Sequence, residues 1–171
     1  KLQNRTFCVV APEGLDSENI KFFNFISDYL NNYNNLRFIW RFHPIYYGRE
    51  NNFIQKNFKN FSKFRNKIIL SKNSIDNDFR NSKFLLFRGS TVVVKGLNKN
   101  LIPINLKLKN DLSNNYFMDS KNFSNLQISE PKDLNDLVFK HKIQNKILYN
   151  KNKILNDYAI INNNIKTKYF I

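Results

Sequence analysis

The motif Arg88-Gly89-Ser90-Thr91 contains residue types that bind phosphate groups. It follows an apolar run and precedes three valines, which predicts a tight turn between a strand and a helix. Glycine lets a backbone approach an anion closely, and hydroxyls with free N–H groups at a helix start supply donors. The alternative is that Ser90 and Thr91 only cap the helix and that Arg88 is a solvated turn residue. The motif matches neither a Walker loop nor the G-x-G-x-x-G fingerprint.

A second candidate is His43, which follows the predicted strand 36–42, where apolar and polar residues partly alternate, and precedes Pro44. Proline ends strand pairing and holds the histidine rigidly, and the imidazole can donate to a phosphate oxygen or stabilise a leaving phosphate. Arg41 precedes it and joins Pro44 among the substrate-binding candidates. The alternative is a histidine that closes the strand end by bonding a backbone carbonyl. A second phosphate-binding motif at residues 88–91 favours the functional interpretation.

Glu13 and Gly14 follow the first apolar run of the chain. A carboxylate there can bind sugar or ribose hydroxyls or act as a base. The alternative is an acidic turn residue near a helix start. For two other residues we expect structural roles: Trp40 fills the core, and His141 lies on the surface of a basic C-terminal helix.

Short apolar runs and helical spacings predict the elements that position these motifs. Strands are predicted at residues 7–11, 36–42, 67–71, 84–87, 101–106 and 126–128. Helices are predicted from Asp16 or Ser17 to about residue 30, within 45–64, from Ser74 to Ser82, after Ser90, and as one long or broken helix from about 131 to 158. Residues 107–124 are predicted to form an irregular loop.

Strands that alternate with helices predict an α/β fold, here a Rossmann-like parallel sheet of about six strands with helices on both faces. Ligands of such sheets bind at the carboxyl ends of the strands, so the three candidate turns are expected on one rim. We expect one domain over residues 1–160 and a frayed tail at 161–171. The chain starts at Lys1 rather than Met, which is typical of a piece of a longer protein.

The formal net charge of +15 comes from 28 Lys and Arg residues against 13 Asp and Glu residues. Such an excess is typical of proteins that bind nucleic acid or anionic membranes. Lysine outnumbers arginine and accompanies abundant Asn, Ile and Phe, the bias of A- and T-rich coding sequence, so part of the charge is expected to carry no function. The single cysteine, Cys8, is predicted to be a small buried hydrophobe. The sequence contains no zinc motif, membrane-spanning run or signal-peptide pattern, which predicts a cytoplasmic protein.

The order of the three motifs resembles the C-terminal, donor-binding half of GT-B-fold glycosyltransferases of bacterial surface-polysaccharide synthesis. The resemblance is strongest to sialyltransferases and polysialyltransferases, which have a His-Pro motif and a later serine pair, and it covers about residues 6–160. It implies that His43 binds the donor phosphate and stabilises the leaving group, and that Ser90 and Thr91 bind the phosphate at a helix start. Thr91 replaces the usual second serine and keeps its hydroxyl. The N-terminal acceptor domain of these enzymes, which carries the acidic catalytic base, is expected to be absent from this chain.

We therefore predict an enzyme domain that binds a nucleotide-activated sugar, with a CMP-sugar favoured, for surface polysaccharide or lipopolysaccharide synthesis. His43 is the catalytic candidate, and the substrate-binding candidates are Glu13, Gly14, Arg41, Pro44, Arg88, Gly89, Ser90 and Thr91. Nothing in the sequence requires a metal or another cofactor.

The expected partners are the nucleotide-sugar donor, a glycan or lipid-linked acceptor and the missing N-terminal domain. The charge adds peripheral contact with an anionic membrane at the inner face of the cell membrane, whereas nucleic acid is not an expected partner. Two alternatives stay open. One is a polyol-phosphate transferase that uses a CDP-linked donor. The other is a non-catalytic basic module that binds nucleic acid or a membrane, which lysines gathered on one face would favour.

Overall fold

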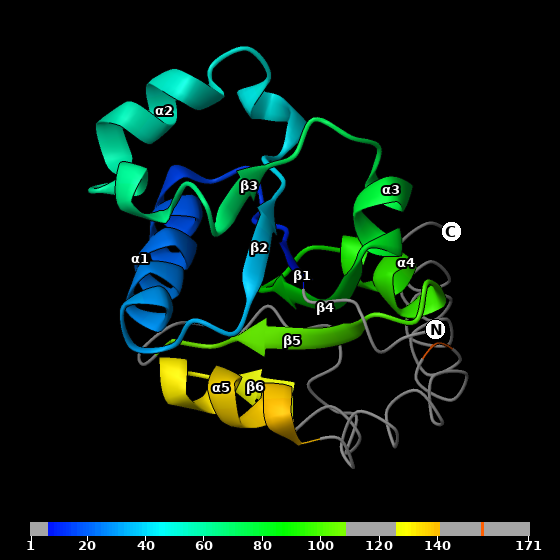
Figure 1. Ribbon diagram of the computed structural model, residues 1–171. Helices are drawn as coiled ribbons and strands as arrows, with labels where there is room; N and C mark the ends of the chain where they lie inside the picture. Colours follow the sequence, from blue (N-terminus) through cyan, green and yellow to red (C-terminus); the bar gives the residue numbers. More distant parts are fainter. Residues whose placement is uncertain (1–6, 109–125, 141–154, 156–171) are drawn as a thin grey trace, which may run out of the picture.

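The computed structural model describes residues 7–108, 126–140 and 155. The predicted parallel sheet is confirmed, with the strands in the order β3-β2-β1-β4-β5-β6 and every neighbouring pair parallel (Figure 1). The strands are β1 (Phe7–Val10), β2 (Arg37–Trp40), β3 (Ile68–Leu70), β4 (Ser82–Phe87), β5 (Ile102–Leu106) and β6 (Gln127–Ile128). The chain winds outward in one direction from β1 and in the other from β4, so the topological switch point lies between these two central strands.

Helices cover both faces of the sheet, as predicted. The helices are α1 (Asp16–Asn32), α2 (Glu50–Asn57), α3 (Ile75–Arg80), α4 (Val92–Asn98) and α5 (Pro131–Phe139), and short 3₁₀ turns form η1 (Pro44–Tyr46) and η2 (Phe61–Phe64). In Figure 1, α1 and α2 lie on one side of the sheet, and α3 and α4 lie on the other. Helix α5 packs beside α1, and Asn35 Nδ2, in the loop after α1, donates a 3.0 Å hydrogen bond to Asn135 Oδ1 of α5. A Cβ atom on Gly96 of α4 would lie 2.6 Å from Leu85 Cδ2, so this helix reaches β4 because it carries a glycine there.

Aromatic packing joins α1, β2 and the chain after α2. Phe23 of α1 stacks on Phe58 with ring centroids 4.2 Å apart, and Trp40 of β2 meets Phe58 edge-on at 5.0 Å. Trp40 is fully buried, which confirms its predicted place in the core. Cys8 is also fully buried, and burial raises the pKa of its thiol, so it behaves as the predicted small hydrophobe.

Helix boundaries differ from the predictions at three places. Neither Asp16 nor Ser17 caps α1, because Leu15 occupies the cap position and offers no side-chain bond. The helix predicted within 45–64 is confirmed as α2 but ends at Asn57, because Phe58 has a non-helical backbone (φ −97°, ψ 87°). The chain then passes through the left-handed region at Asn60 (φ 58°) and turns again as η2. Ser74 does cap α3, whereas Ser82, predicted to end that helix, belongs to β4.

The predicted C-terminal helix is confirmed over residues 131–139. It ends there because Lys140 has a non-helical backbone (φ −81°, ψ 77°). The rest of that prediction, apart from helical Leu155, lies outside the described residues, as do His141, the tail at 161–171 and almost all of the loop predicted at 107–124.

Candidate functional site

Three candidate turns leave the sheet at one rim, because parallel strands end on the same edge. Backbone hydrogen bonds show that the turns after β1, β2 and β4 begin side by side: Ala11 N donates to Leu86 O at 3.1 Å, and Arg41 N donates to Val10 O at 3.0 Å. The predicted convergence at the carboxyl rim is therefore present in the backbone.

Gly14 and His43 lie against each other across this rim. A Cβ atom built on Gly14 would lie 3.2 Å from His43 Nδ1 and 3.4 Å from Ile45 Cγ2. Real Cβ atoms seldom come so close, so the glycine leaves the space that the imidazole occupies. The sequence predictions placed both residues in one site, and the structure brings the two together.

The side chain of His43 is exposed, and one of its nitrogens is engaged in its own turn. Its Nδ1 accepts a 3.3 Å hydrogen bond from Ile45 N, at the start of η1. A neutral imidazole that accepts at Nδ1 carries its proton on Nε2, so Nε2 is the donor. The predicted structural alternative, a bond to a backbone carbonyl, is replaced by a bond from a backbone amide. The geometry leaves an N–H donor at the rim, which suits an anionic ligand.

Pro44 opens η1, whose position is set by a hydrogen bond to α1. Tyr46 is buried, and its hydroxyl donates to Asp16 Oδ1 at 2.5 Å. Burial and the Asp16 carboxylate raise the pKa of Tyr46 to about 12, so this bond persists through neutral pH. The contact fixes the His43 turn to the first turn of the helix that follows Gly14.

The guanidinium of Arg41 points into the fold and makes a three-part contact there. It pairs with Asp78 of α3, which is 1% exposed, and it donates to Ser71 Oγ at 3.0 Å and to Asn73 O at 2.8 Å. Ser71 in turn donates to Asp78 at 2.5 Å. Arg41 thus joins the ends of β2 and β3 to α3, and its predicted role as a ligand residue stays a prediction.

Arg88 and Glu18 form a second partly buried pair, at the switch point between β1 and β4. Their side chains are 16% and 7% exposed, with Arg88 Nε 3.3 Å from Glu18 Oε1. Glu18 also accepts a 2.6 Å bond from Glu13 N, and Arg88 donates to Leu106 O at 3.4 Å. Burial raises the pKa of Glu18, although the Glu13 amide and the Arg88 cation oppose the shift. This network holds the Glu13-Gly14 turn against the end of β4.

The hydroxyl residues of the third turn differ in what they bond. Ser90 Oγ accepts a 3.4 Å bond from Val92 N, so it acts as a weak cap, consistent with the structural alternative for this residue. Thr91 occupies the cap position with a helical backbone (φ −63°, ψ −12°), makes no side-chain cap bond and is exposed. Gly89 is buried beside them. A phosphate contact by these three residues stays a prediction.

Sequence reasoning missed the two carboxylates that hold the rim together. Glu18 and Asp78 are among the few buried charged residues of the described chain, and both pair with an arginine just beyond a strand end. Each lies on the first turn of a helix, where acids are common, so spacing carried no signal for burial. Within residues 7–108 and 126–140, no cluster of three or more His, Cys, Asp or Glu side chains is arranged to hold a metal ion.

No known protein family and no curated protein matches the sequence. Solved structures do match. The chain is similar to the glycotransferase of kitacinnamycin (TM-score 0.59, 8% identity, covering 91% of this chain and 40% of that one). It is also similar to the GtfA/B complex (TM-score 0.61, 8% identity, 91% and 33% covered). A third is the UDP-GlcNAc 2-epimerase from Neisseria meningitidis bound to UDP-GlcNAc (TM-score 0.57, 14% identity, 92% and 45% covered).

At these identities the likeness shows the fold: an α/β, Rossmann-like domain that resembles one half of a GT-B protein. The chain spans less than half the length of each of the three structures. Among the helices of the described residues, none is both long and apolar enough to cross a membrane.

Proposed function

We propose that this chain is the nucleotide-sugar-binding domain of a glycosyltransferase, with the donor bound at the carboxyl rim of the sheet. The observation that carries the proposal is the contact between Gly14 and His43, which sets an imidazole N–H donor beside a stretch of backbone without a side chain. Such a pairing beside the switch point of a parallel sheet suits a phosphate that bridges a nucleoside and a sugar.

The mechanism is a direct displacement at the sugar carbon that bears the phosphate. As the acceptor oxygen bonds to that carbon, the bond to the nucleotide phosphate breaks, and negative charge grows on the leaving phosphate. The Nε2–H of His43 and the hydroxyls of Ser90 and Thr91 stabilise this charge more in the transition state than in the ground state. A base outside this chain removes the proton of the acceptor hydroxyl, and the acceptor is a glycan or a lipid-linked glycan. The buried pairs of Arg41 and Arg88 hold the turns in place.

The resemblance of the His-Pro and Ser-Thr motifs to those of bacterial sialyltransferases favours CMP as the nucleotide of the donor, and a surface polysaccharide or lipopolysaccharide made in the cytoplasm as the product. A second candidate is a nucleotide-sugar epimerase that uses a uridine nucleotide, because one of the similar structures is a UDP-GlcNAc 2-epimerase. The two candidate enzymes differ in their substrates: a glycosyltransferase turns over only with an acceptor, whereas an epimerase acts on the nucleotide sugar alone.

A titration with CMP, UMP, UDP and GMP tests the proposal. We expect CMP to bind, and the double variant Ser90→Ala, Thr91→Ala to bind it about tenfold more weakly, as for the loss of charge-assisted hydrogen bonds. Asn98→Ala is the matched control, since Asn98 is an exposed residue at the C-terminal end of α4, away from the carboxyl rim of the sheet. Tighter binding of UDP than of CMP would favour the epimerase, and the absence of any nucleotide binding would refute both.

A further inference from the structure

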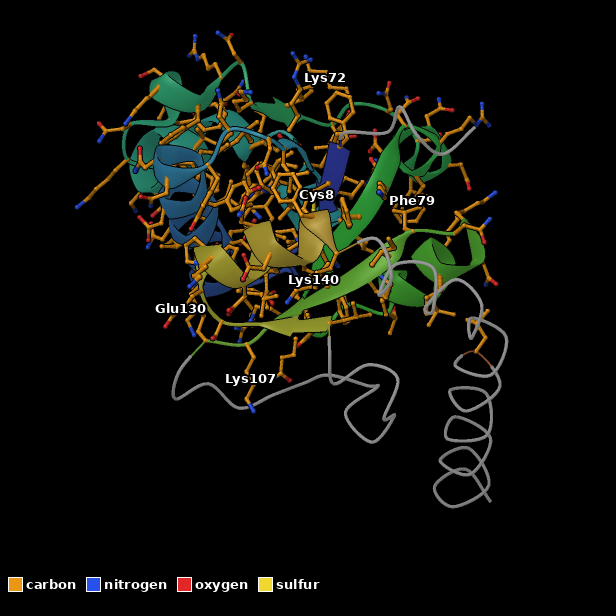
Figure 2. The ribbon with its side chains drawn as sticks, turned by 60° about the horizontal axis from the view of Figure 1, so that its bottom comes forward. Cys8, Lys72, Phe79, Lys107, Glu130 and Lys140 are labelled. Carbon is orange, nitrogen blue, oxygen red and sulfur yellow. The ribbon has the colours of Figure 1, made fainter. Side chains whose placement is uncertain are left out.

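A basic segment of the chain runs from α2 through η2 to the start of α3. Residues 51–75 contain no Asp or Glu, and they carry six basic side chains: Lys56, Lys59, Lys63, Arg65, Lys67 and Lys72. Five of the six are exposed, and Lys67 is half-buried. We call residues 51–75, which lie between Glu50 and Asp76, the basic edge. In Figures 1 and 2 the ribbon of the basic edge occupies one side of the molecule, and Lys72 lies on that side.

The charges of the basic edge are not compensated by described carboxylates. The bonds that its cations make are to neutral groups: Lys63 Nζ to Asn31 Oδ1 at 2.7 Å, and Lys67 Nζ to Asn34 O at 3.2 Å. Two lysines at α4 are arranged differently. Lys95 and Lys99 both pair with Asp76, at 3.1 and 3.3 Å. Codon bias explains lysines in general, but it does not explain why residues 51–75 contain no Asp or Glu.

Two further features of the basic edge favour a lipid surface over single-stranded nucleic acid as its anionic partner. The aromatic rings of the basic edge point inward: Phe53, Phe58 and Phe64 belong to the core, and Phe61 is packed against it. A surface that binds single-stranded nucleic acid offers exposed rings for bases to stack on, and this one does not. Instead its exposed apolar group is Ile69 of the edge strand β3, which is 44% exposed and suits shallow contact with acyl chains.

We infer that the basic edge is a docking surface for an anionic phospholipid bilayer. Lysine ammonium groups act as point charges toward a negative lipid surface, and their attractions add within a Debye length of that surface. The inference goes beyond the proposed function and does not depend on it, because it rests on the cations of residues 51–75 and not on a bound nucleotide.

Sedimentation with lipid vesicles tests the inference. The probe is phosphatidylcholine vesicles in which about a third of the lipid is phosphatidylglycerol, at about 0.1 M salt, with pure phosphatidylcholine for comparison. The test variant carries Lys56→Gln, Lys59→Gln, Arg65→Gln and Lys72→Gln. The control variant carries Arg80→Gln, Lys99→Gln, Lys132→Gln and Lys140→Gln, which removes the same charge from exposed residues elsewhere. Thermal unfolding checks that both variants fold.

We expect the parent protein to bind only the anionic vesicles, and the test variant to bind them about tenfold more weakly or worse. The control variant should retain most of the binding. Three results would overturn the inference: no binding by the parent, equal losses in both variants, or tighter binding of a single-stranded oligonucleotide than of vesicles with the test variant losing that binding instead.

Discussion

The carboxyl rim has two layers that differ in how their polar groups are used. In the inner layer, Arg41 and Arg88 each pair with a buried carboxylate, Asp78 and Glu18, and each ties together elements that are distant in sequence. In the outer layer, His43 is exposed and bonds only within its own turn. The charged residues of the rim therefore build the site, and in our account neutral donors bind the ligand. From the sequence alone, two arginines just beyond strand ends would be expected to bind the ligand themselves.

The largest expected effect is in the inner layer. Replacing Arg41 with Met leaves Asp78 buried with only Ser71 as a donor, so we expect unfolding to become easier by about 3 kcal/mol, near the lower limit for breaking a buried pair because the arginine is partly exposed. Urea unfolding measures this. Arg80→Met is the matched control, since Arg80 is exposed in the same region, and it should change stability by less than about 0.5 kcal/mol. Equal effects of the two variants would show that Arg41 does not hold the rim.

The second prediction concerns the outer layer and uses two glycines. Gly14→Ala brings a Cβ atom to 3.2 Å from His43 Nδ1, so the exposed imidazole must shift. We expect nucleotide binding to weaken about fivefold while stability changes by less than about 0.5 kcal/mol. Gly48→Ala should do the opposite: Gly48 has φ +76° with open space around it, so alanine there should cost about 1 kcal/mol of stability and leave binding unchanged. Calorimetry and urea unfolding together distinguish the outcomes, and unchanged binding in Gly14→Ala would contradict the account.

The smallest effect is a pH dependence in the inner layer. Burial raises the folded-state pKa of Glu18, so the folded protein binds this proton more tightly than the unfolded chain does. The parent should therefore gain stability relative to Glu18→Gln as the pH falls from about 7 towards about 4, where the unfolded carboxyl also titrates. The difference between the two unfolding free energies measures Glu18 alone, because the other acids are common to both proteins. A parent that loses relative stability on acidification would show that the Arg88 pair outweighs burial.

Much of the fold could be predicted because its signals are local. Continuous apolar runs such as 84–87 and 101–106 mark strands buried on both faces, and Ser74 marks a helix start by its side chain. What could not be predicted depends on contacts between distant residues. The pairs Arg41–Asp78 and Arg88–Glu18 join residues far apart in the chain, and nothing in their spacing indicates that the acids are buried.

The convergence of the three candidate turns was predictable in the same way. Parallel topology alone placed the three turns on one rim, because every strand ends at the same edge. The contact of Gly14 with His43 was not predictable in detail, since it depends on how α1 and η1 are joined by Tyr46 and Asp16. Ser90 Oγ accepts a hydrogen bond from Val92 N, so the hydroxyl proposed to bind the ligand also acts as a helix cap. The residue type alone does not tell these two roles apart.

The most direct measurement of the central claim is nucleotide affinity in His43→Ala, set beside its stability. Because the imidazole is exposed and bonds only to Ile45 N, its removal should change the free energy of unfolding by less than about 0.5 kcal/mol. If Nε2–H donates to the phosphate, CMP should bind ten- to a hundredfold more weakly, or about 1–3 kcal/mol. His43→Gln, which keeps an N–H donor, should restore part of the loss. Unchanged affinity in a folded His43→Ala protein would contradict the account.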